Sequence, residues 1–144
     1  MIGLGNTLRG DDALGRIAAE RVRRRVDPQE VKVIDQCAPT PELCADLSLV
    51  SRVIFLDASA DGPIGHLVTR RLKPREAAAS MVHHMDLDGL LGMTRHLYGD
   101  SPTGFAVTFR GRSFALNDCH LTPEVEAACD LLVNEALRLL DSLP

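Results

Sequence analysis

The chain has 144 residues, a length typical of one domain that buries its core without disulfides or metals. Apolar residues make up 45% and charged residues 25%, as in globular proteins, and the few aromatic residues imply an aliphatic core. The formal net charge of −4 argues against nucleic acid as the main ligand. No apolar run reaches the roughly 20 residues that cross a membrane. No secretory leader precedes the first motif, so we expect a cytoplasmic protein. The small size and a pI near 5.7 fit a monomer.

The first third of the chain alternates between strand and helix patterns. Met1–Leu4 predicts a short buried strand, shorter than a usual central strand. Asp12–Val26 has apolar residues at helical spacing with arginines opposite, which predicts an amphipathic helix with a solvated basic face. Asp27 and the following proline end this helix, and the alternating residues Val31–Asp35 predict the next strand.

The middle of the chain predicts a helix followed by two strands. Thr40 as N-cap, with proline and glutamate after it, predicts a helix that runs to about Leu49. The continuous apolar run Val53–Ala58 predicts a central parallel strand buried on both faces. After a glycine-rich turn, His66–Leu72 alternates and predicts an antiparallel edge strand.

The last third predicts two further helices and one more strand. Asp86–Tyr98 has a leucine face and is followed by Gly99, which predicts a helix with a glycine stop. Phe105–Phe109 predicts a strand, with a short extension at Ser113–Leu116, and a threonine-proline-glutamate sequence at Thr122 begins the final helix. We expect its inward residues to be Val125, Cys129, Leu132, Val133, Leu137 and Leu140.

Strands that alternate with helices in this way imply an α/β fold in one domain, residues 1–144. We expect a twisted, mostly parallel sheet of about five strands with helices on both faces. In such a sheet the loops at the carboxyl ends of the strands meet at one crevice, where ligands bind.

Three predicted loops or strand ends carry polar side chains that can meet at this crevice: Asp11 with Asp12, Asp57, and His83 with His84. Two carboxylates and an imidazole form an oxygen and nitrogen ligand set that suits zinc, nickel or cadmium. Each has a structural alternative. In that alternative, one acid of the first pair serves as the N-cap of the following helix and Asp57 serves as an acceptor for loop N–H groups. The two histidines would then be ordinary surface residues.

Other chemistries lack their motifs. The glycines at positions 3, 5 and 10 match neither nucleotide-binding pattern, and two acids at a helix start repel phosphate. No serine-hydrolase motif is present. The cysteines lack C-x-x-C spacing and a nucleophile motif, and two of them fit helix cores, so we expect reduced thiols. They are Cys37, Cys44, Cys119 and Cys129.

Four segments, in the same order along the chain, resemble the hydrogenase maturation endopeptidases. They are the glycine-asparagine opening Gly3–Asp12, the apolar strand Val53–Ala58, the histidine segment His83–Leu87, and the helix start Leu121–Val125. Together they span nearly the whole chain, and the opening motif is the most specific. Two softer matches, Thr40–Leu43 and Leu97–Gly99, are similar to the branch that serves bidirectional NAD(P)-linked hydrogenases.

The resemblance implies an endopeptidase that removes the C-terminal extension of a nickel-loaded hydrogenase large-subunit precursor. It implies a metal and catalytic site of two acids and one histidine, which falls here on Asp12, Asp57 and His83. His83 fits better than His84 because it has the family's distance to Leu87. It also implies that the metal is nickel carried by the substrate, which cadmium or zinc can replace in crystals. A chaperone that binds the precursor in a nickel-dependent way without cutting it is the alternative.

Overall fold

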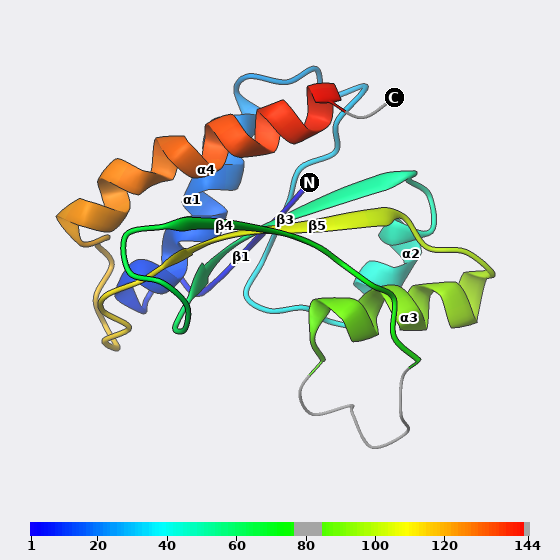
Figure 1. The fold of residues 1–144 in the computed structure, drawn as a ribbon, viewed down its shortest axis with the longest axis horizontal. Helices are drawn as coiled ribbons and strands as arrows, with labels where there is room; N and C mark the ends of the chain where they lie inside the picture. Colours follow the sequence, from blue (N-terminus) through cyan, green and yellow to red (C-terminus); the bar gives the residue numbers. More distant parts are fainter. Residues whose placement is uncertain (77–84, 143–144) are drawn as a thin grey trace. The chain divides into compact units, whose positions relative to one another are not determined.

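The computed structural model describes residues 1–76 and 85–142 and contains the predicted alternation of strands and helices (Figure 1). The elements are β1 (Ile2–Leu4), the short 3-10 helix η1 (Gly10–Ala13), α1 (Leu14–Arg23), β2 (Ile34–Gln36), α2 (Leu43–Leu47), β3 (Arg52–Ser59), β4 (Leu67–Arg71), α3 (Leu87–Tyr98), β5 (Thr103–Arg110) and α4 (Pro123–Ser142). Among these helices none is long and apolar enough to cross a membrane.

The five strands form one sheet in the order β2-β1-β3-β5-β4. β1 pairs in parallel with both of its neighbours, and Gly3 lies between Asp35 of β2 and Leu56 of β3. β1 is therefore an inner strand although it has only three residues, because strands on both sides satisfy its backbone.

Backbone hydrogen bonds give the direction of the remaining strands. The N–H of Thr103 donates to Ser51 and that of Gly111 donates to Ser59, with the same sequence offset at both ends of β5. A constant offset is the pattern of a parallel pair, so β3 and β5 are parallel. Leu72, just after β4, donates to Gly104 at the start of β5. The end of β4 thus lies beside the start of β5, which confirms the predicted antiparallel edge strand.

The chain divides into two compact units, and β3, β4 and β5 each contribute residues to both. The first unit contains Met1–Ala38, Ile54–Thr69 and the described part of Ala106–Pro144. Within it α1 packs against β1 and α4, as the blue and orange helices of Figure 1 show. The side chains buried there from the two helices include Leu14, Ala18, Val22, Val125, Cys129, Leu132 and Val133.

The second unit contains Pro39–Val53 and the described part of Arg70–Phe105. Its helices α2 and α3 lie side by side, and the thiol of Cys44 is 3.9 Å from the carbonyl oxygen of Leu90 (Figure 1). α3 has the predicted ends: Asp86 accepts from the N–H of Gly89 at 2.8 Å, and Gly99 adopts a left-handed φ of 87°.

Several predicted boundaries were wrong, for local reasons. α1 begins at Leu14 rather than Asp12, because residues 10–13 form η1, and it ends at Arg23, short of Val26. Thr40 does not cap α2: the N-cap is Glu42, and Thr40 accepts the N–H of Leu43 only through its carbonyl.

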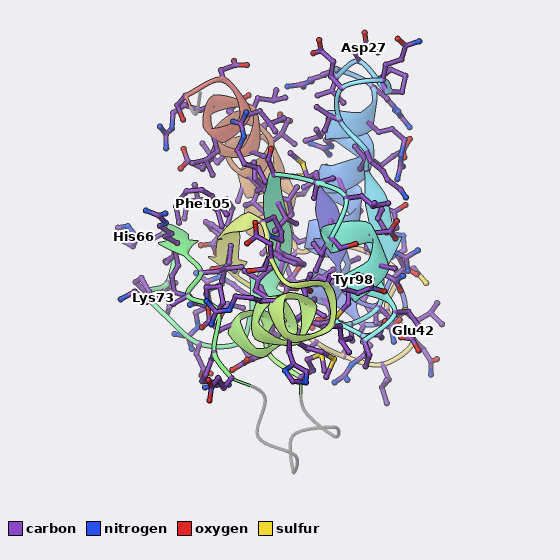
Figure 2. The ribbon with its side chains drawn as sticks, turned by 90° about the vertical axis from the view of Figure 1, so that its right-hand side faces the viewer. Asp27, Glu42, His66, Lys73, Tyr98 and Phe105 are labelled. Atoms are coloured by element: carbon purple, nitrogen blue, oxygen red, sulfur yellow. The ribbon has the colours of Figure 1, made fainter. Side chains whose placement is uncertain are left out.

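The strand predicted at Val31–Asp35 begins at Ile34, because the N–H of Val31 is used in the turn after α1, where it donates to Asp27. Figure 2 shows Asp27 beyond the C-terminal end of α1. The predicted strand extension at Ser113–Leu116 is irregular instead. In α4 the buried face turns slightly from the predicted one, so that Ala136 and Leu139 are buried while Leu137 and Leu140 are partly exposed.

Candidate functional site

The candidate site lies at the edge of the sheet where the parallel strands β1 and β3 end. These strands are parallel and paired through Gly3 and Leu56, so Asp57 follows directly at this edge of the sheet. The first turn of α1 packs tightly against the two strand ends. A Cβ at Gly15 would lie 2.4 Å from the carbonyl oxygen of Leu4 and 2.1 Å from that of Leu56. Glycine at this position therefore allows the segment that carries Asp12 to approach the sheet.

Asp57 has the most altered acidity of the carboxylates at this edge. Burial raises its pKa from 3.8 to about 7, a hydrogen bond from the N–H of Ala58 lowers it in part, and the negative charge of Asp12 raises it further. The structure thus brings Asp12 and Asp57 close enough to repel each other. Asp57 therefore keeps its proton up to a much higher pH than an ordinary carboxylate.

Asp12 is oriented by the loop that precedes it. Its Oδ2 accepts the N–H of Asn6 at 2.9 Å, and the side chain of Asn6 accepts the N–H of Leu8 at 2.9 Å. Gly5 has φ of +127°, and a Cβ there would lie 1.7 Å from the carbonyl oxygen of Asp12. The glycine-asparagine motif therefore folds back onto this carboxylate and fixes its direction.

Asp11, the neighbouring acid, has a different role. It is fully buried, and its carboxylate accepts the N–H groups of Arg112 at 2.7 Å, Ser113 at 3.0 Å and Thr122 at 2.7 Å. The hydroxyl of Thr122 donates a fourth hydrogen bond at 3.0 Å. Burial alone would raise the pKa of Asp11, but these hydrogen bonds outweigh it and hold the pKa below its usual value.

These contacts correct the expectation that one acid of the pair caps the helix. Neither η1 nor α1 has a side-chain cap. Asp11 instead joins the opening motif to the loop before α4, which Figure 1 draws near η1. Two backbone bonds strengthen the junction, from Gly10 to Asp118 at 2.7 Å and from Asp11 to Ser113 at 2.9 Å. Asp12 is therefore the member of the pair that remains available to a ligand.

His83 and His84 lie outside the described residues, so their place relative to the two acids stays a prediction. Within residues 1–76 and 85–142 no group of three or more histidine, cysteine or acidic side chains could hold a metal ion. The described part of the chain thus supplies two carboxylates of the predicted ligand set, Asp12 and Asp57.

The buried role of Asp11 was not found from the sequence. Its partners lie 101 to 111 residues away, and no spacing rule connects them. The only local signal was the pair of adjacent acids, whose repulsion requires that they point in different directions. The cysteine predictions were correct where they concerned burial, since Cys44 and Cys129 are buried.

Comparison with known proteins identifies the architecture. The hydrogenase maturating endopeptidase HybD from E. coli superposes with a TM-score of 0.79 at 23% identity, covering 98% of this chain and 90% of that one. A hydrogenase 2 maturation peptidase from a Thaumarchaeota archaeon superposes with a TM-score of 0.71 at 28% identity, covering 96% and 95%. The fold is that of the hydrogenase maturation endopeptidases.

A further structure with the hydrogenase maturation endopeptidase fold is similar over nearly the whole chain. The NiFe hydrogenase maturation protease HycI from Thermococcus kodakarensis has a TM-score of 0.75 and 21% identity, covering 97% of this chain and 90% of that one. No protein-family model and no curated protein sequence matches the chain. The likeness therefore rests on three-dimensional structure.

Proposed function

We propose that this chain is an endopeptidase that removes the C-terminal extension of a nickel–iron hydrogenase large-subunit precursor. The observation that carries the proposal is the Asp12–Asp57 pair, at the carboxyl edge of the sheet in a hydrogenase maturation endopeptidase fold. The sequence matches at Thr40–Leu43 and Leu97–Gly99 favour a bidirectional, NAD(P)-linked hydrogenase as the partner. We propose the cytoplasm as the compartment.

In this proposal nickel belongs to the substrate, and the enzyme holds no metal at rest. Carboxylate oxygens of Asp12 and Asp57, with the imidazole of His83, contact the nickel of the precursor. A cation at this position favours the ionised form of Asp57, which gives up its proton when the precursor docks. Contact with the metal centre places the peptide bond to be cut beside the two carboxylates, so positioning supplies much of the rate.

The cleavage step needs a nucleophile and a base. We propose that water attacks the carbonyl carbon, that one carboxylate accepts the proton of this water, and that the amide nitrogen leaves as a protonated amine. Asp11 does not fit the role of base, because both of its oxygens already accept hydrogen bonds. Asp12 fits better, since within residues 1–76 and 85–142 its side chain accepts one hydrogen bond, from the N–H of Asn6.

Incubation of the purified chain with nickel-loaded precursor tests the proposal. We expect a shortened large subunit by mass spectrometry, and no cleavage with Asp57→Asn or His83→Ala. Asp61→Asn, at an exposed acid of the first unit, is the matched control and should cleave normally. Undiminished product from both site variants would remove these residues from the site. Nickel-dependent binding of the precursor without shortening would identify a chaperone instead of a protease.

A further inference from the structure

A charged groove runs along α1 in the first unit, next to the candidate site. It has a volume of about 370 Å³, within the range of about 300–1,000 Å³ typical of ligand sites. It is open to solvent and is built from the opening loop, one face of α1 and the strand β2. The residues that line it are Thr7, Arg16, Ile17, Glu20, Arg21, Arg24 and Asp35.

Most of the charged side chains in this groove are already paired. Glu20 forms ion pairs with Arg23 and Arg24, and Asp35 forms one with Arg23 at 3.0 Å. Arg21 is neutralised by two acidic side chains of α4. These pairs hold both acids of the groove against neighbouring arginines and leave little negative charge facing a ligand.

Arg16 is different. Its Nη1 lies 3.9 Å from the thiol sulfur of Cys37, which is a weak contact. Among residues 1–76 and 85–142 no carboxylate forms an ion pair with it, although Asp12 and Glu20 lie four positions away on either side in sequence. A guanidinium has five N–H donors in a planar fork that matches a carboxylate, and a thiol is a poor acceptor. The groove therefore carries one cationic group whose best partner would come from outside the chain.

The groove reaches the loop that orients Asp12. Thr7, at one end, follows Asn6, whose N–H donates to the Asp12 carboxylate. Arg16 lies in the first turn of α1, close behind that carboxylate in sequence. From Arg16 to Arg24 the helix rises about 12 Å, the length of three or four extended residues. A peptide that leaves the candidate site along α1 passes Arg16 first.

We propose that this groove binds the peptide next to the cleavage point of the precursor, with Arg16 holding a carboxylate of the C-terminal extension. The inference rests on the proposed function and adds its substrate class: an extension with an acidic side chain, or its terminal carboxylate, within a few residues of the bond that is cut. Arg16 forms the bidentate contact. The groove gives selectivity against neutral extensions, because a neutral extension offers no carboxylate to the Arg16 guanidinium.

Nuclear magnetic resonance on the ¹⁵N-labelled full chain tests the groove without requiring cleavage. Three synthetic peptides serve as probes at low salt: acetyl-Val-Glu-Ala-amide, acetyl-Val-Gln-Ala with a free carboxyl terminus, and the neutral acetyl-Val-Gln-Ala-amide. We expect one or both acidic peptides to shift the amide signals of Thr7, Arg16 and Ile17, and the neutral peptide to leave them in place. Comparison of the two acidic probes distinguishes a side-chain carboxylate from a terminal one.

Variants of Arg16 test whether its guanidinium binds the acidic peptides. Arg16→Ala should raise the Kd of the acidic peptide about tenfold, and Arg16→Lys should raise it less, since it keeps the charge but not the fork. Arg25→Ala removes the same charge from an exposed position just beyond α1 and should leave the Kd unchanged. Equal Kd values for the original chain and Arg16→Ala, or shifts confined to other residues, would overturn the inference.

Cleavage assays separate this inference from the proposed function. If the precursor is cut and Arg16→Ala raises KM with little change in kcat, both stand. If the precursor is cut with the same KM by the original chain and Arg16→Ala, the groove inference fails alone. If acidic peptides bind the groove but nickel-loaded precursor is never shortened, the groove stands and the endopeptidase proposal fails.

Discussion

Asp57 makes the stability of the chain depend on pH in a direction opposite to that of most carboxylates. Its pKa rises from 3.8 to about 7 on folding, so the folded chain holds this proton more tightly than the unfolded one. The contribution of Asp57 to stability is therefore greatest below pH 4 and falls as pH rises towards 7, by about 4 kcal/mol at 1.36 kcal/mol per pKa unit. Between pH 5 and pH 8 the loss from this group is about 2 to 3 kcal/mol.

Asp57→Asn should abolish this loss, because the amide does not ionise. Urea unfolding at pH 5 and pH 8 measures the difference: the free energy of unfolding of Asp57→Asn, relative to the original chain, should improve by about 2 to 3 kcal/mol between the two pH values. Asp61→Asn, at an exposed position, is the control for loss of one charge and should show no such change. If the free energies of unfolding of the original chain and Asp57→Asn change with pH in the same way, the claim that burial and the charge of Asp12 raise the pKa of Asp57 is refuted.

Three further predictions follow from described contacts. Asp11→Ala leaves the N–H groups that donate to Asp11 without an acceptor, so urea titrations should show a free energy of unfolding lower by about 3 kcal/mol. A loss below about 1 kcal/mol would contradict the view that Asp11 holds the opening motif to the loop before α4. Gly5→Ala places a Cβ 1.7 Å from a backbone oxygen at φ +127°, so it should lower the Tm and slow processing, and an unchanged Tm would show that the loop relaxes freely. Burial raises the pKa of Cys129 to about 11, so iodoacetamide at pH 8 should modify the exposed Cys37 and Cys119 but not Cys129; mass spectrometry of the modified peptides checks this.

The elements that the sequence predicted best are those whose signals are local. β3 is a continuous apolar run, and α3 carries its own N-cap at Asp86 and its own stop at Gly99. Each of these features acts within a few residues, so the one-dimensional pattern contains it. The strand predicted at Val31–Asp35 was displaced because its first N–H is used in the turn after α1, which a strand pattern does not register.

The site was predictable in part for the same reason. Asp57 follows from its place at the end of an apolar strand, and its closeness to Asp12 follows from the parallel sheet. The function of Asp11 was not predictable, because the donors that bind it come from residues 112 to 122. Arg16 was not identified from the sequence either, because only the structure shows that no carboxylate of the described residues pairs with it.

The hydrogen bonds of Asp11 have a consequence for the order in which the enzyme is made. The acid is synthesised among the first residues, but the N–H groups that satisfy it are among the last third. Until the segment around Thr122 has left the ribosome, burial of the Asp11 carboxylate is unfavourable, because its hydrogen-bond donors are missing. The opening motif is then not held against the loop before α4. Under the proposed function, cleavage competence arrives late in synthesis, and a nascent chain or one truncated before Thr122 is not expected to process hydrogenase precursors.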